Sequence, residues 1–207
     1  NDLIGDFAIA YWNNHQKKLF LIRDHFGKKP IYYAKFKDYF LFNSSINGLK
    51  DIITDKTIDD FSLLNYLSYG NMFDDKTIFK EIKQVLPGTI LVWDAESGFI
   101  SDFKYFNLRE KFSRDNFLKF SYEDLTTQLS EKLEEVISSH LCSDVPISIL
   151  LSSGIDSKAI ARYSYSSKIK AYTADFQTNN KEIENANKFN KYFSEMEHEL
   201  VKINDFK

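Results

Sequence analysis

The chain has 207 residues, a mass of 24.3 kDa and a net charge of -3, which leaves room for one large domain or two small ones. Hydrophobic residues make up 43% and aromatic residues 16%, with 7 Gly and 3 Pro, so disordered, collagen-like and low-complexity classes are excluded. Neither charge sign forms a long block, and nothing attracts nucleic acid or anionic lipid over distance. These properties favour a globular protein that acts on small molecules.

The cysteine and histidine content limits the function further. The one cysteine, Cys142, cannot form an intrachain disulfide, and the 4 histidines show no metal-ligand spacing. No apolar run approaches the roughly 18 residues of a membrane span. We therefore expect a cytoplasmic protein with no structural zinc, no nucleic-acid partner and no membrane partner. Because residue 1 is Asn and an apolar run already includes Phe7, we also expect a fragment of a longer protein.

The first half of the chain is predicted to be rich in β-strands. Four short apolar runs, separated by polar or Gly- and Pro-containing breaks, predict an antiparallel meander. These runs are residues 7–12, 19–23, 31–36 and 39–43. A turn at Pro87-Gly88 leads into a strand at residues 89–94, and a further strand ends near Tyr105.

A helix interrupts this β-rich half at residues 59–69. Its apolar side chains fall near one face of the helix, and Gly70 follows as a C-terminal cap. The apolar residues of this face are Phe61, Leu64, Tyr66 and Leu67.

The second half has a different pattern. Residues 108–120 are polar without a clear period and are interpreted as a linker, and Ser121 then caps a helix with Asp124 three residues on. The apolar face of that helix comprises Leu125, Leu129, Leu133, Val136, Ile137 and Leu141. Strands and helices then alternate, which predicts a parallel, doubly wound sheet. The expected order is strand 147–151, helix 157–166, strand 170–176, helix 181–193 and strand 199–203.

The loop at residues 152–157, Ser-Ser-Gly-Ile-Asp-Ser, is the segment most informative about chemistry. It lies between a buried strand and a helix N-terminus, where first-turn amides lack helical acceptors and the helix dipole favours anions. Serine hydroxyls at Ser152, Ser153 and Ser157 can add donors, and Asp156 is suited to a magnesium ion that bridges phosphate oxygens. The alternative is an ordinary turn in which Asp156 or Ser157 caps the helix.

This loop resembles the Ser-Gly-Gly-x-Asp-Ser pyrophosphate loop of ATP pyrophosphatases, and the surrounding chain resembles glutamine-dependent asparagine synthetases. The landmarks of that family occur in order. They are residues 6–12, 23–33, 77–82, 86–88 and 140–146, followed by a strand at 171–176 and a helix-strand unit at 184–201.

The resemblance implies an α+β part followed by an α/β part. Residues 1–107 would be the C-terminal part of a glutamine amidotransferase domain with a partial N-terminal-nucleophile (αββα) fold, and residues 108–120 a linker. Residues 121–207 would begin a doubly wound, parallel-sheet ATP-pyrophosphatase domain. The implied enzyme is a ligase that converts aspartate to asparagine through an acyl-adenylate, with ATP, Mg²⁺ and glutamine as nitrogen donor. No catalytic glutaminase residue is expected in this chain, and a homodimer is left open.

The resemblance also implies a set of ATP- and pyrophosphate-binding residues at the loop and at two strand ends, with Asp156 as the metal ligand. The set is Leu151, Ser152, Ser153, Gly154, Ile155, Asp156, Ser157 and Ala174. Leu151 and Ala174 would each end a strand at the crevice where doubly wound sheets bind nucleotides. For these two residues, packing in the core is the alternative.

Four residues depart from the family pattern. Ser153 and Asp175 stand where Gly is usual or frequent, Lys158 replaces a common Ser, and Ser45 replaces a frequent Glu. Ser153 fits if its backbone does not need a positive φ. Two alternatives therefore stay open, namely an amidotransferase for another carboxylate, of the surface-sugar or β-lactam type, and a degenerate relative without catalysis.

Five further side chains are predicted to be structural. Cys142 ends an amphipathic helix and has no neighbouring base, and Arg23 with Asp24 is interpreted as a loop-holding pair. His25 and His198 are interpreted as packing residues, since a lone histidine seldom acts as a catalyst.

Overall fold

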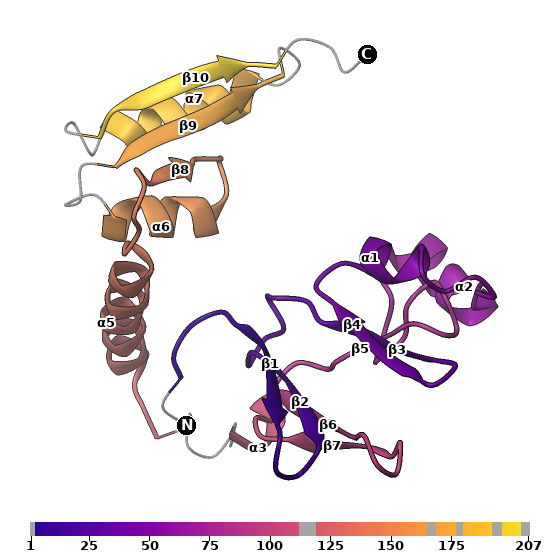
Figure 1. Ribbon diagram of the computed structural model, residues 1–207. Helices are drawn as coiled ribbons and strands as arrows, with labels where there is room; N and C mark the ends of the chain where they lie inside the picture. The colour runs from indigo at the N-terminus through magenta and orange to yellow at the C-terminus, as the bar shows by residue number, and fades with distance from the viewer. Residues whose placement is uncertain (1–2, 112–118, 165–168, 177–179, 192–195, 204–207) are drawn as a thin grey trace. The chain divides into compact units, whose positions relative to one another are not determined.

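The computed structural model describes residues 3–111, 119–164, 169–176, 180–191 and 196–203 (Figure 1). The chain divides into two compact units, residues 1–113 and 114–207. None of the described helices is both long and apolar enough to cross a membrane.

Unit 1 contains two antiparallel sheets (Figure 1). The first has the order β1-β2-β6-β7 and the second the order β4-β3-β5. Its elements are β1 (Ala8–Asn13), β2 (Lys18–Arg23), β3 (Tyr32–Phe36), β4 (Tyr39–Asn43), α1 (Ile46–Lys50), α2 (Asp60–Tyr69), β5 (Lys83–Gln84), β6 (Thr89–Asp94), β7 (Ile100–Lys104) and α3 (Leu108–Lys111).

The predicted meander is wrong in its pairing, although each of its strands exists. The pair β1-β2 is joined by Tyr11↔Phe20 and the pair β3-β4 by Tyr33↔Phe42, but β2 pairs with β6 instead of β3, as in Leu21↔Leu91. The turn between β2 and β3 therefore carries the chain from one sheet to the other.

Two apolar clusters hold unit 1 together, one on each side of the second sheet. Between the sheets lie Leu19, Leu21, Ile31, Val85 and Leu91. Against α1 lie Ala34, Leu49, Ile53 and Ile82. Because alternate strand residues face opposite sides, β3 contributes Tyr33 to the first cluster and Ala34 to the second. The second sheet is thus a middle layer between the first sheet and α1.

The helix predicted at residues 59–69 is present as α2, with Asp59 as N-cap and Gly70 as a left-handed C-cap. Its predicted apolar face is, however, turned away from the core. Leu64 and Leu67 are 60% and 74% exposed, whereas Ser62 and Asn65 are buried.

Unit 2 begins with a long helix and continues as a parallel sheet. Its elements are α5 (Tyr122–His140), β8 (Ser148–Leu150), α6 (Ile155–Ser164), β9 (Lys170–Asp175), α7 (Asn180–Lys191) and β10 (His198–Lys202). The predicted capping box at the start of α5 is confirmed, since the side chains of Ser121 and Asp124 each bind the other's backbone N–H. Along α5, Ile137 is buried while Leu129 and Val136 are 60% and 40% exposed.

The parallel strands of unit 2 confirm the predicted α/β alternation, in the order β10-β9-β8. The core gathers on one face of this sheet, where β8 and β9 meet α6 and α7. It comprises Ile149, Leu151, Ala161, Ile169, Ala171, Ala186 and Met196. These strands follow one another in chain order, so the described part of the sheet does not include the reversal of strand order that defines double winding.

The helices at the boundary and in unit 2 differ from prediction at their ends. The expected linker 108–120 contains α3, and residues 112–118 lie outside the described residues. The last residues predicted for the two later helices, 165–166 and 192–193, also lie outside them.

Candidate nucleotide-binding site

The loop between β8 and α6 places Asp156 inside the first turn of the helix. Helix α6 begins at Ile155, two residues before the predicted start, and the Lys158 N–H donates to the Gly154 carbonyl over 3.3 Å. Gly154 therefore occupies the N-cap position. The capping interpretation of Asp156 and Ser157 is wrong, because both residues follow the cap.

Two serine hydroxyls hold this loop in a closed turn. The Ser157 hydroxyl accepts from the Ser152 N–H over 3.2 Å and lies 2.8 Å from the Ser152 hydroxyl. It also lies 3.1 Å from the carbonyl oxygens of Ser152 and Gly154, and the Ser152 hydroxyl accepts from the Gly154 N–H over 3.2 Å. Since these hydroxyls bind within the loop, the first-turn amides are the donors best placed for an anion.

Ser153, which stands where the family usually has glycine, has an unstrained backbone. Among the described residues other than glycine, positive φ occurs only at Lys17, Lys37 and Asp74. Ser153 therefore has an ordinary conformation, which satisfies the condition under which serine fits this position.

Asp156 presents a single exposed carboxylate at the first turn of α6. The described residues contain no group of three or more His, Cys, Asp or Glu side chains that could hold a metal ion. Magnesium in nucleotide sites commonly binds one or two carboxylates together with substrate phosphates. An accessible carboxylate beside first-turn amides that have no intrahelical acceptor fits that arrangement.

Leu151 and Ala174 lie at neighbouring strand ends but point to opposite faces of the sheet. Leu151 is 2% exposed and belongs to the core, and its N–H donates to the Tyr172 carbonyl over 2.8 Å. Ala174 is half-buried and pairs with Val201. The side chain of Leu151 thus has the packing role that we gave as the alternative, and only its backbone lies at the strand end.

A buried link to the loop was not predicted from the sequence. The Thr173 hydroxyl lies 2.6 Å from the Leu151 carbonyl and 2.8 Å from Nε2 of His198. Because a carbonyl only accepts and threonine has one O–H, Thr173 donates to Leu151 and Nε2 of His198 donates to Thr173. His198 is thus a structural residue that ties β10 to the strand end beside the loop. The sequence carries no signal that these two distant residues pair.

Burial lowers the pKa of His198, and this makes unit 2 sensitive to acid. The unfolded chain binds the proton near the ordinary imidazole pKa of about 6.5, and the folded chain binds it less readily. The contribution of neutral His198 to the free energy of unfolding is therefore fully present above about pH 6.5 and decreases as the pH falls below that value. We expect the His198→Gln variant, whose amide can still donate to Thr173, to lose this pH dependence.

The measurement is a series of thermal unfolding curves by circular dichroism between about pH 7.5 and 5.5. Both tryptophans, Trp12 and Trp93, lie in unit 1, so tryptophan fluorescence reports the unfolding of unit 1 alone. A transition that circular dichroism detects and fluorescence does not is therefore the unfolding of unit 2. An equal acid shift in His198→Gln and in the parent protein would contradict the assignment.

In unit 1, the buried side chains of Arg23 and Asp24 bind the loop that follows them, at residues 26–29, and Arg23 also binds the segment at Val85. The Arg23 guanidinium donates to the carbonyls of Gly27, over 2.7 Å, and Lys29, over 3.1 Å, and also to the Val85 carbonyl. Gly27 has φ +68°, and an added Cβ would lie 2.8 Å from the Pro87 ring, so the loop must approach this closely. The structural role predicted for Arg23 is confirmed.

The Asp24 carboxylate binds backbone N–H groups of the same loop. It accepts from Phe26 over 3.1 Å, Lys28 over 3.0 Å and Lys29 over 2.8 Å. Burial raises the pKa of Asp24, but these hydrogen bonds outweigh it and hold the pKa below its usual value. The structural role predicted for Asp24 is therefore confirmed.

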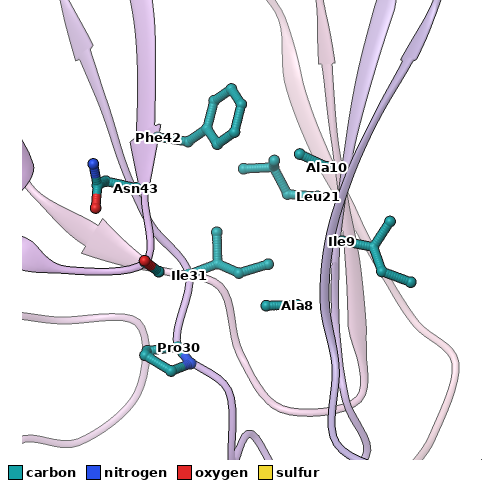
Figure 2. Close-up of a pocket in the computed structure, with 9 residues that line it drawn as sticks. Ala8, Ile9, Ala10, Leu21, Pro30, Ile31, Phe42 and Asn43 are labelled. Atoms are coloured by element: carbon teal, nitrogen blue, oxygen red, sulfur yellow. The ribbon is translucent and has the colours of Figure 1, made fainter.

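A hollow of about 320 Å³ in unit 1 is lined mainly by apolar residues. Phe42, Leu21 and Ile31 point toward one another across it (Figure 2). The lining comprises Ala8, Ile9, Ala10, Leu21, Pro30, Ile31, Phe42, Asn43 and Ser44. This lining has no cysteine, histidine or carboxylate side chain, and its polar side chains are those of Asn43 and Ser44.

Two further residues are interpreted as structural, Cys142 and His25. Cys142 is exposed just after α5, so its structural role stays a prediction, whereas the surroundings of His25 are consistent with packing. The ring of His25 makes edge-to-face contacts with Phe7, Tyr105 and Phe106, at centroid distances of 6.3, 5.4 and 4.8 Å.

Comparison with known proteins agrees with this two-part organisation. The family model described as a glutamine amidotransferase domain matches residues 1–106, and the one described as asparagine synthase matches residues 128–205. Asparagine synthetase [glutamine-hydrolyzing] 3 of Bacillus subtilis (strain 168) is 28% identical over 188 residues, covering 86% of this chain and 30% of the relative. Asparagine synthetase [glutamine-hydrolyzing] 1 of the same strain is 29% identical over 179 residues, covering 84% of this chain and 27% of the relative.

A relative with a different name is similar to the same extent. Amidase chry2 of Gibberella zeae is 27% identical over 161 residues, covering 77% of this chain and 23% of the relative.

The chain therefore joins a glutamine amidotransferase part to a synthase part. It belongs to the family of glutamine-hydrolysing asparagine synthetases. It spans less than a third of the length of the curated relatives that it matches.

Proposed function

We propose that this chain is part of an ATP-dependent ligase that forms an amide with nitrogen from glutamine. In the proposed reaction aspartate attacks the α-phosphorus of ATP, which gives a β-aspartyl adenylate and releases pyrophosphate. Ammonia then displaces AMP and asparagine is formed. The observation that carries the proposal is the closed serine turn before α6, which sets the first-turn amides and the Asp156 carboxylate at one exposed site.

In this site the amides of Ile155, Asp156 and Ser157 would bind the pyrophosphate part of ATP, because they precede Lys158, whose N–H is the first in the helix to donate to an intrahelical carbonyl, that of Gly154. Asp156 would hold magnesium, which neutralises charge on the phosphate oxygens. Ser152 and Ser157 would keep the turn in shape, while Ser153 and Gly154 line it. Leu151 and Ala174 would border the nucleotide at the carboxyl ends of β8 and β9.

The proposal includes residues 1–107, 108–120 and 121–207 as the end of an N-terminal-nucleophile glutaminase, a linker and the start of a doubly wound ATP-pyrophosphatase domain. The matches to the two family models, at residues 1–106 and 128–205, support that division. A cytoplasmic location belongs to the same proposal.

The test is exchange of labelled pyrophosphate into ATP by the full-length protein, which requires a reversible adenylation step. Exchange that depends on aspartate and magnesium supports the proposal. Exchange that depends on a different carboxylate favours the alternative acceptor, for which the similarity to an amidase is the supporting observation. Absence of exchange with every carboxylate, despite a folded protein, would identify a degenerate relative.

We expect no glutaminase activity from the 207-residue chain by itself. Its one thiol, Cys142, lies in unit 2, within the part that matches the asparagine synthase model, so the amidotransferase part here has no cysteine nucleophile. The measurement is ammonia release from glutamine. Release that disappears in the Cys142→Ser variant would overturn this prediction.

A further inference from the structure

Thr173 is a polar side chain in the core of unit 2. It is 2% exposed in β9, and because alternate strand residues face opposite sides, it shares its face of the sheet with Ala171, a member of the apolar core. A buried hydroxyl costs free energy unless its hydrogen bonds are made, whereas a valine of the same shape would pack there without that cost. Packing therefore does not account for the hydroxyl, and its role lies in its hydrogen bonds.

The first hydrogen bond replaces a backbone bond at the end of β8. The Leu151 N–H donates to the Tyr172 carbonyl over 2.8 Å, which continues the parallel ladder one residue past β8. In a regular parallel ladder the carbonyl of the same residue would accept from a backbone N–H of the neighbouring strand. Here the Thr173 hydroxyl donates to the Leu151 carbonyl over 2.6 Å. The chain can therefore leave the sheet at Leu151 without a buried, unpaired carbonyl.

The second hydrogen bond fixes the direction of the first. Nε2 of His198 lies 2.8 Å from the Thr173 hydroxyl and donates to it. His198 begins β10 and pairs with Ala171, so it reaches Thr173 from the strand on the other side of β9. Because the hydroxyl oxygen accepts from His198, the single O–H of Thr173 is directed at Leu151. One hydroxyl thus connects the three strands of the described sheet.

The carbonyl that Thr173 binds belongs to the peptide group that starts the loop. The Leu151 carbonyl and the Ser152 N–H are parts of one rigid, planar unit. The Ser152 N–H donates to the Ser157 hydroxyl over 3.2 Å, which is one of the bonds that close the turn. Thr173 therefore holds one side of this peptide plane from the sheet, and Ser157 holds the other side from α6. Together the two hydroxyls set the orientation of the turn, and hence of the first-turn amides, relative to the sheet.

We propose that Thr173 is a positioning residue for the nucleotide-binding loop, which it holds through the Leu151–Ser152 peptide while His198 orients its hydroxyl. This inference rests on the proposed function, in which the first-turn amides of α6 bind the pyrophosphate part of ATP. A displacement of about 1 Å in a catalytic site can cost about a hundredfold in rate. Because Ser157 still holds the other side of the peptide, we expect removal of the Thr173 hydroxyl to cost on the order of tenfold.

The test is exchange of labelled pyrophosphate into ATP by the full-length protein and three variants, at a temperature at which circular dichroism shows all of them folded. Thr173→Val removes the hydroxyl and keeps the shape, Thr173→Ser keeps the hydroxyl, and Ser164→Ala is the matched control. Ser164 is 0% exposed at the end of α6 farthest from the loop, and its hydroxyl donates to the Ile160 carbonyl over 2.7 Å. The control therefore removes a buried hydrogen bond of unit 2 that does not touch the loop.

The quantity compared is the exchange rate divided by the pyrophosphate concentration at half-maximal exchange. We expect it to fall about tenfold in Thr173→Val and to stay within about twofold of the parent in Thr173→Ser and Ser164→Ala. A merely structural role of Thr173 would lower the unfolding midpoint in Thr173→Val and Ser164→Ala alike and leave exchange unchanged. Exchange by Thr173→Val that equals the parent's, or an equal loss in Ser164→Ala, would overturn the proposal.

Calorimetric binding of MgATP separates this inference from the proposed reaction, because binding needs no acceptor carboxylate. We expect Thr173→Val to bind MgATP about tenfold more weakly than the parent and Thr173→Ser to bind it equally well. His198→Leu leaves the Thr173 hydroxyl in place but removes the donor that orients it, so it should weaken binding in the same direction. Binding in the parent without exchange on any carboxylate would refute the proposed function alone. Equal affinities in the parent, Thr173→Val and His198→Leu would overturn the positioning role, and a parent that binds no MgATP would overturn both.

Discussion

Replacing Asp156 with asparagine in the full-length protein is expected to lower carboxylate-dependent pyrophosphate release by about a hundredfold or more. Asparagine keeps the size and shape of the side chain but removes the charge that magnesium requires. A metal clamp contributes several kcal/mol to such reactions, and about 1.4 kcal/mol is already tenfold in rate. Unfolding should barely change, because Asp156 is exposed and follows the N-cap position of α6.

The control variants are Asp144→Asn and Asp156→Ala. Asp144 is an exposed carboxylate in the segment before β8, so its neutralisation changes the net charge without touching the loop. We expect Asp144→Asn to retain full turnover and Asp156→Ala to lose turnover as Asp156→Asn does, without the roughly 1 kcal/mol cost of a lost cap. Unchanged turnover in Asp156→Asn would refute the metal assignment, whatever the unfolding midpoints are.

The sequence predicted the strands of unit 1 well because their signal is local. In β2, the continuous apolar run from Leu19 to Ile22 marks the strand, because a short apolar run between turn residues is typical of a strand. Pairing carries no such local signal. The partner of β2 is β6, which lies beyond α2 along the chain, and the proximity of β3 in sequence led to the wrong meander.

The same limit applies to α2. Asp59 and Gly70 fix the two ends of the helix through their own side-chain and backbone chemistry, and both caps could be predicted. Helical periodicity shows which side chains share a face but not whether that face lies inward. Contacts outside the helix, at Ile78 and Lys76, decide its orientation.

The loop before α6 was predicted in kind but not in its detail. Preference for Asp and Ser at N-caps placed the helix start two residues late, because the Ser157 hydroxyl binds back to Ser152 instead of capping the helix. The Thr173–His198 contact joins two strands that are separated by α7, and such pairing between distant residues has no signature in a single sequence. The residue types of the loop could therefore be predicted from the sequence, whereas the hydrogen bonds that hold the loop in place could not.

Asp24→Asn is expected to destabilise unit 1 by about 3 kcal/mol or more, the cost typical of breaking a buried, charged hydrogen-bond network. The carboxylate accepts from three backbone N–H groups, at Phe26, Lys28 and Lys29, and is 2% exposed. Asparagine supplies one acceptor oxygen and turns an NH₂ group toward the remaining donors, which then lose their partner. Fluorescence of Trp12 and Trp93 reports the unfolding of this unit selectively.

The pH dependence of the same variant gives an independent check. Because the folded pKa of Asp24 is lowered, its stabilising effect is complete above the unfolded value of about 3.9 and is lost as the pH falls through the folded one. The difference in stability between the parent and Asp24→Asn should therefore be largest near neutral pH and should shrink in acid. Asp38→Asn, at an exposed turn between β3 and β4, should match the parent throughout. A difference for Asp24→Asn that does not change with pH would mean that the carboxylate charge does not hold this loop.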